Sequence, residues 1–123
     1  MGTAHIIPLP CPGLMESIEH GDIHGEELEQ FLARLFEPFE KQKLDAVVLG
    51  CTHYPFVSRE LTHVLGEDVA LFEGGPGTAR ETKRRIAAAG LLRSGTEKGT
   101  ILFENSSQPK EKEKLCRKLL GII

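Results

Sequence analysis

The chain has 123 residues, of which 40% are hydrophobic, and this is enough apolar material for one modest domain. Its formal net charge of -3 gives no broad basic surface for nucleic acid. The apolar runs fall far short of the roughly 20 residues that a membrane-spanning helix needs, and the first residues do not resemble a secretory leader. We therefore expect a cytoplasmic protein with neither nucleic-acid nor membrane partners.

Three cysteines, Cys11, Cys51 and Cys116, are spread widely along the chain. An odd number at wide spacing is a poor basis for a disulfide framework and suits a reducing compartment. At least some of these thiols are therefore expected to be free.

The first third of the chain predicts one irregular strand and two helices. Residues 5–11 are extended, but their prolines limit them to a short or irregular strand. Residues 13–21 fit a short helix that Gly21 closes. From Glu26 the apolar residues recur with the spacing of one helical face, and Pro38 should kink or shorten the end of that helix. The apolar positions are Leu28, Phe31, Leu32, Leu35, Phe36 and Phe39.

The middle of the chain predicts a strand, a helix and a second strand. Residues 45–50, "DAVVLG", form a short apolar run typical of parallel strands that are covered on both faces. Pro55 begins the next helix and Gly66 ends it. The inner face of that helix would carry Phe56, Val57, Leu61, Val64 and Leu65. Residues 68–73, "DVALFE", supply the next strand.

The last third predicts two more helices with a strand between them. The "GGPG" turn leads into a helix from about Thr78 to Ala89, in which the basic cluster Lys83–Arg85 should form a solvated face. After a polar loop, "GTILFEN" reads as a strand and "KEKEKLCRKLLG" as a helix. This alternation predicts an α/β fold with a mainly parallel sheet flanked by helices. With about four strands, however, the helices outweigh the sheet, so the fold is expected to be incomplete.

A cysteine, a threonine and a histidine follow the central strand in the run Gly50–Pro55, "GCTHYP". Ligands of open α/β sheets bind beyond the carboxyl ends of the strands. Cys51 would lie there, near the start of a helix and two residues from His53. Both features can lower a cysteine pKa from its usual ~8.5, so this turn can supply a thiolate as a nucleophile or a base.

Two other readings of the Cys-Thr-His run, and one of the later "GGPGTA" turn, stay open. A cysteine after a buried strand can be merely a small hydrophobic residue. A metal site is disfavoured, because Cys-x-His offers two ligands and no second pair follows at metal spacing. The "GGPGTA" turn lacks the lysine of a phosphate loop and the spacing of a dinucleotide motif, although its backbone N–H groups can face an anion. The other candidate ligands, which form no recognised pattern, are Cys11, His20, His24 and His63.

The run Val47–Phe56, "VVLGCTHYPF", resembles the second cysteine motif of the glutamate racemases, which interconvert L- and D-glutamate without a cofactor. Three further segments resemble that family in the same order: "PCPGLMESIEHG" before the motif, and "LFEGGPGTARETKRRI" and "ILFENSSQPKEK" after it. The resemblance covers nearly the whole chain, and the Gly-Cys-Thr-His-Tyr-Pro run is its most specific part.

The resemblance implies a role for four residues. Cys51 is similar to one of two catalytic cysteines that face opposite sides of the substrate α-carbon, and it would act on L-glutamate. Thr52 would help to hold the substrate carboxylate, His53 would assist proton transfer at Cys51, and Glu19 would lie near both. No metal and no cofactor is implied, because a thiol can take or release a proton near neutral pH.

The family pattern also has features that this chain lacks. Its members are about twice as long and consist of two similar α/β domains, with a first cysteine in a Cys-Asn-Thr motif of the earlier half. Neither Cys11 nor Cys116 matches that motif, and both read as structural. By this pattern residues 1–75 would be most of the second domain. Residues 76–123 would return to pack on the missing first domain, so we expect a C-terminal part of a racemase that is inactive alone.

The implied function is the supply of D-glutamate for peptidoglycan and hence for cell-wall biogenesis and cell shape. Glutamate would be the small-molecule partner, and the chain would form a homo-oligomer or associate with the missing N-terminal half. Two alternatives stay open. One is another racemase or isomerase of the superfamily, acting on aspartate or a hydantoin. The other is a non-catalytic binding or regulatory module with an incidental thiol.

Overall fold

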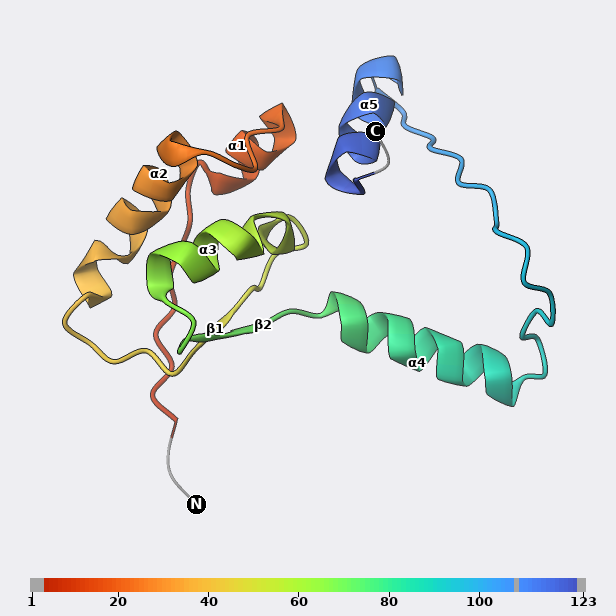
Figure 1. Ribbon diagram of the computed structural model, residues 1–123, viewed down its shortest axis with the longest axis horizontal. Coiled ribbons are helices and arrows are strands. Elements are labelled where there is room, and N and C mark those ends of the chain that lie inside the picture. Colours follow the sequence, from red (N-terminus) through yellow and green to blue (C-terminus); the bar gives the residue numbers. More distant parts are fainter. Residues whose placement is uncertain (1–3, 108, 122–123) are drawn as a thin grey trace.

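A computed structural model describes residues 4–107 and 109–121 (Figure 1). Helices and strands alternate in its middle part, as the sequence predicted, whereas two helices follow one another at each end. In chain order they are α1 (Leu14–His20), α2 (Glu26–Phe36), the 3-10 turn η1 (Glu37–Phe39), β1 (Ala46–Val48), the 3-10 turn η2 (Tyr54–Val57), α3 (Ser58–Leu65), β2 (Ala70–Phe72), α4 (Gly75–Ala88) and α5 (Pro109–Leu119). No helix within the described ranges is both long and apolar enough to cross a bilayer.

The sheet is small and parallel. β1 and β2 pair in register from Ala46 opposite Ala70 to Val48 opposite Phe72. One further bond extends the pairing, because the Leu49 N–H donates to the Phe72 carbonyl at 2.8 Å. The connection between the strands runs through α3, as expected for a parallel pair. The predicted α/β class with a parallel sheet is therefore confirmed.

Helix ends largely follow the local signals. α1 stops at Gly21, whose φ of 88° is left-handed and therefore suits glycine. α2 ends at Phe36, where Pro38 converts the continuation into the single turn η1. α4 begins at Gly75, earlier than the predicted Thr78, because its proline can occupy the first helical turn, where an N–H has no intrahelical partner anyway.

Two of the predicted strands are wrong. In the part of the chain that the structure describes, residues 5–11 and 99–105 have no strand assignment. Pro8 and Pro10 cannot donate to a ladder, which accounts for the first segment. In the second segment the Leu102 side chain is 79% exposed, so no layer covers it. The prediction that the central strand is covered on both faces is also wrong, because Val48 is 75% exposed.

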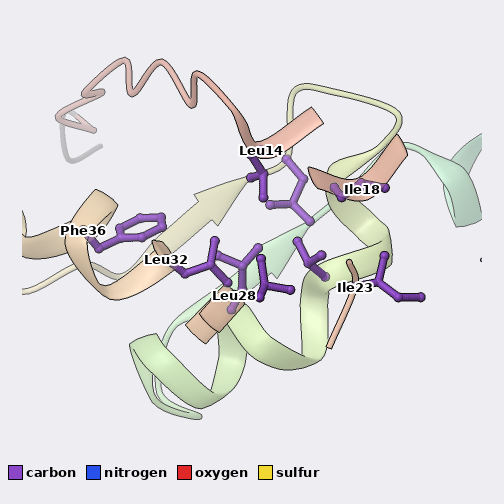
Figure 2. Close-up of a cluster of buried hydrophobic side chains, with 9 residues drawn as sticks. Leu14, Ile18, Ile23, Leu28, Leu32 and Phe36 are labelled. Atoms are coloured by element: carbon purple, nitrogen blue, oxygen red, sulfur yellow. The ribbon is translucent and has the colours of Figure 1, made fainter. Parts of the chain in front are cut away.

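The hydrophobic core lies between α1, α2 and α3 (Figure 2). Its most buried members, such as Ile18, Leu32 and Val57, are fully inaccessible. Burying an aliphatic side chain of this size contributes about 1.5–3 kcal/mol. The core comprises Leu14, Ile18, Ile23, Leu28, Leu32, Phe36, Leu49, Val57 and Leu61. All of these residues precede β2, so the N-terminal part of the chain holds the core.

The segment between β2 and α5 is largely exposed. α4 has no buried residue and extends away from α1, α2 and α3, and a long irregular stretch leads from it back to α5 (Figure 1). The basic cluster Lys83–Arg85 lies on its solvated surface, as predicted. Glu81 accepts hydrogen bonds from Arg84 and Arg85, which lower the pKa of its carboxyl to about 2. Large apolar side chains are also uncovered here, including Leu91, Leu92, Ile101 and Leu102.

Candidate functional site

The turn after β1 presents Cys51 and His53 at the carboxyl end of the sheet. Leu49 is anchored to β2, and the chain then bends through Cys51–His53 into η2. The Tyr54 N–H donates to the Cys51 carbonyl at 3.3 Å, and the Phe56 N–H donates to the His53 carbonyl at 3.0 Å. These bonds fix the turn at the strand end, where α/β proteins bind their ligands.

Within this turn the Cys51 thiol contacts the His53 ring. The Sγ and Nδ1 atoms are 3.6 Å apart, which is within hydrogen-bond reach for sulfur. The pKa of Cys51 is lowered, first by the backbone N–H of His53 and then by the imidazole of the same residue. Donors to sulfur stabilise a thiolate, so this geometry favours the reactive form of Cys51.

The far side of the His53 ring faces Glu19 in the last turn of α1. The His53 Nε2 and Glu19 Oε1 atoms are 2.9 Å apart. The pKa of His53 is raised, first by its hydrogen bond to Glu19 and then by Cys51. Because an ionised carboxylate only accepts hydrogen bonds, Nε2 must carry the proton. Nδ1 is then the ring atom that can exchange a proton with Cys51.

The second oxygen of Glu19 pairs with Lys112 of α5. Lys112 Nζ forms an ion pair with Glu19 Oε2. The pKa of Glu19 is lowered, with the Lys112 hydrogen bond as the largest cause and His53 as the next. The side chains of His53, Glu19 and Lys112 are 26%, 36% and 33% exposed, so solvent screens part of these interactions. The side chains of Cys51, His53, Glu19 and Lys112 thus form one line of contacts that runs from the turn to α5.

Thr52 and the other two cysteines occupy different surroundings. Thr52 is exposed beside Cys51. Cys11 is partly buried and donates its thiol to the Leu9 carbonyl at 3.4 Å. Burial raises the pKa of Cys11, although a hydrogen bond with Tyr54 acts in the opposite direction. Cys116 is half-buried in α5, and all three thiols are free, in agreement with the expectation from their number.

The remaining histidines lie outside this line. His24 Nδ1 lies 2.7 Å from Glu60 Oε1, and His63 Nδ1 lies 2.9 Å from Glu29 Oε1. His20 instead contacts the carbonyl of its own helix through Nδ1. Among residues 4–107 and 109–121 no group of three or more side chains could hold a metal ion. The two histidine–glutamate pairs join α2, or the loop that precedes it, to α3, and they do not form a common site.

The structure brings together three of the four residues singled out in the sequence. Cys51, His53 and Glu19 are in contact, and Thr52 is their exposed neighbour. Sequence reasoning missed Lys112. It lies in the charged run "KEKEK", where nothing in the spacing separates it from neighbouring lysines, so only the placement of α5 identifies it.

No protein-family model matches the chain. Curated proteins do match it, along nearly its whole length. The glutamate racemase of Clostridium novyi (strain NT) is 41% identical over 99% of this chain and 48% of its own length. A glutamate racemase of Clostridium perfringens is 41% identical over 95% of this chain and 45% of its own length. The chain thus spans about half the length of the curated relatives that it matches.

Two solved structures are similar in fold. A glutamate racemase from Francisella tularensis, in complex with D-glutamate, superposes with a TM-score of 0.73 at 22% identity, covering 91% of this chain and 42% of that one. Glutamate racemase isoform RacE1 from Bacillus anthracis gives a TM-score of 0.66 at 24% identity over 90% of this chain and 41% of that one. The fold is therefore that of part of an α/β racemase, and the resemblance predicted from the motifs is confirmed.

Proposed function

We propose that this chain, whose sequence matches about half of a glutamate racemase along nearly all its length, is the C-terminal part of such an enzyme. In this proposal Cys51 is one of two cysteines that transfer a proton at the α-carbon of glutamate. The contact of Cys51 with His53, itself bound to Glu19, is the observation that carries the proposal.

The proposed reaction is a proton exchange without a cofactor. The Cys51 thiolate removes the α-proton of L-glutamate, so that a C–H bond breaks, an S–H bond forms and the carbon retains the electron pair. A second thiol on the opposite face then gives its proton to that carbon, which leaves D-glutamate. His53 and the backbone N–H groups of the turn stabilise the thiolate form of Cys51 and so raise the fraction of Cys51 that can accept a proton at neutral pH.

Substrate binding would use the same turn. Thr52 is exposed next to Cys51, where its hydroxyl and backbone N–H can receive the carboxylate on the reacting carbon. The similar Francisella tularensis racemase was solved with D-glutamate, which supports a small amino acid as the ligand. We therefore assign Thr52 to substrate binding and Cys51, His53 and Glu19 to proton transfer.

The distribution of buried and exposed residues along the chain supports the view that a second half of the enzyme is needed. Residues 1–75 would form most of one racemase domain, since the buried core residues found in the described part of the chain lie between positions 14 and 61. Residues 76–123 would return to the other domain, which suits the unburied helix α4 and the exposed side chains of Leu91 and Leu102. The opposing cysteine would come from that other half, so the chain alone should be inactive.

The biological role follows from the product. D-Glutamate produced by the whole enzyme would enter peptidoglycan and so support cell-wall biogenesis and cell shape. Its synthesis would take place in the cytoplasm, where a reducing environment keeps Cys51 and the opposing cysteine as thiols.

A chimaeric enzyme tests the proposal. This chain replaces the matching half of the Clostridium novyi racemase, and formation of D-glutamate from L-glutamate is followed by chiral chromatography. We expect turnover by the chimaera, none by the 123-residue chain alone, and loss of turnover in the chimaera with Cys51→Ser. Cys116→Ser is the matched control, since that thiol belongs to α5 and not to the turn, and it should retain activity.

Two results would reject the assignment. Turnover by the chimaera that survives Cys51→Ser would remove Cys51 from the reaction. Turnover by the isolated chain that Cys51→Ser abolishes would show that no second half is required. L-Aspartate offered to the same chimaera tests the other racemase reading, and an unperturbed Cys51 thiol would favour the non-catalytic module.

A further inference from the structure

Lys112 reaches the residues around Cys51 from the other end of the chain. Its Nζ pairs with Glu19 Oε2, although the two residues are 93 positions apart in sequence. The other oxygen of the same carboxylate accepts a hydrogen bond from His53 Nε2 at 2.9 Å. Glu19 thus has one oxygen for each of two donors, and only one of those donors belongs to the strand-end turn.

The helix that carries Lys112 is docked on α1, beside which it lies in Figure 1. Lys118 Nζ donates to the Gly21 carbonyl at 2.5 Å. Leu115 covers the same glycine, its Cδ1 lying 3.7 Å from the position that a Cβ would take there. Leu119 packs against the hydrophobic core. These contacts hold the helix and so restrict the position of Lys112. An isolated ion pair between two long surface side chains lacks such support, and ordering it costs side-chain entropy.

We propose that Lys112 is a positioning residue for Cys51, acting through Glu19 and His53. By holding one carboxylate oxygen, Lys112 keeps the other oxygen directed at His53 Nε2. The ring then presents Nδ1 to the thiol. The role in racemisation rests on the proposed function, whereas the effect on Glu19 and His53 does not.

Two physical effects of Lys112 act on Glu19. A second hydrogen bond restricts the rotation of a carboxylate that is 36% exposed. The nearby positive charge favours the ionised form, which accepts hydrogen bonds at both oxygens and therefore fixes the proton on His53 Nε2. Without Lys112, Glu19 would protonate at higher pH, and its orientation toward His53 would be less restricted.

The test is a titration of the His53 ring in the 123-residue chain by NMR, with His53→Asn used to assign its signals. The ring reports the protonation of Glu19 as an inflection at low pH. In Lys112→Met we expect this inflection to move up by roughly one pH unit, the low end of the shift that an adjacent opposite charge causes. Lys112→Arg keeps the charge, so its inflection should lie at the same pH as in the original chain.

Lys114→Met is the matched control, because Lys114 is exposed on the same helix. It should leave the low-pH inflection of His53 where it is in the original chain. Alkylation of Cys51, followed by mass spectrometry of its peptide, should slow at neutral pH in Lys112→Met and stay unchanged in Lys114→Met. A purely structural role for Lys112 would not move the inflection selectively.

An unchanged inflection in Lys112→Met, in a chain that circular dichroism shows to be folded, overturns the proposal. If the methionine variant does not fold, Lys112→Gln decides by the same titration, since it keeps a hydrogen-bond donor but removes the charge. No turnover is measured, so the result stands whether or not the racemase assignment holds. Conversely, an inactive chimaera would leave the role of Lys112 in setting Glu19 intact.

Discussion

Glu19 and His53 are 34 positions apart in sequence, yet Glu19 Oε1 lies 2.9 Å from His53 Nε2. The contact joins the last turn of α1 to the bend after β1. It therefore depends on the packing of α1 against η2, and it fixes which ring nitrogen of His53 faces Cys51.

Removing the charge of Glu19 should change His53 and Cys51 together. In Glu19→Gln the pKa of the His53 imidazolium should fall toward its ordinary value, because Glu19 is the largest cause of its rise. A histidine that is less often protonated stabilises the Cys51 thiolate less, so the pKa of Cys51 should rise. NMR titration of the His53 ring measures the first change. Glu16→Gln, an exposed position on the same helix, should leave both groups unaffected.

The same pair should make stability depend on pH. The raised pKa of His53 stabilises the fold below the ordinary value of 6.5 and loses this effect as pH rises through the folded value. The lowered pKa of Glu19 stabilises it above 4.5 and loses the effect as pH falls through the folded value. The difference in unfolding free energy between the original chain and His53→Asn should therefore be largest between these two values. Urea titrations at several pH values measure it, and a difference independent of pH would contradict this linkage.

Thiol reagents should distinguish the three cysteines. Cys51 should react fastest near neutral pH, since its pKa is lowered, while that of partly buried Cys11 is raised. Iodoacetamide labelling with peptide mass spectrometry at short times gives the order. His53→Asn should slow labelling of Cys51 and leave Cys116 unchanged. Equal rates at Cys51 and Cys11 would mean that the turn does not activate its thiol.

The core between α1, α2 and α3 should be sensitive to truncation. Leu32→Ala removes a fully buried side chain, and cavities of this kind cost about 2–5 kcal/mol. Leu102→Ala is the control, because that leucine is 79% exposed and its loss should change stability little. Denaturant unfolding measures both, and similar costs at the two positions would show that residues beyond β2 are packed in solution.

Exposed apolar residues after β2 should promote association. Leu91, at 74% exposure, and Leu102 leave hydrophobic surface in contact with water. We expect sedimentation velocity to show assemblies that grow with protein concentration, and Leu91→Ser with Leu102→Ser to reduce them. A chain that stays monomeric at high concentration would indicate that these side chains find cover within one molecule.

The sequence predicted local structure well where a residue carries its own signal. Gly21 and Pro38 mark helix ends through backbone geometry alone, and the apolar spacing of α2 suffices to place its buried face. The two missing strands show the limit of such signals, because a strand forms only when another strand pairs with it. Lys112 shows the same limit for the site, since its partner lies in a distant helix and no local pattern encodes that contact.

The position of Lys112 also orders events during synthesis. Chains emerge from the ribosome N-terminus first, and the buried core residues up to Leu61 are therefore available before α5. Glu19, Cys51 and His53 can then meet while α5 is still untranslated. The carboxylate of Glu19 gains its lysine only when α5 has emerged, so the electrostatic setting of the Cys51 thiol is completed later than the contact between Cys51, His53 and Glu19.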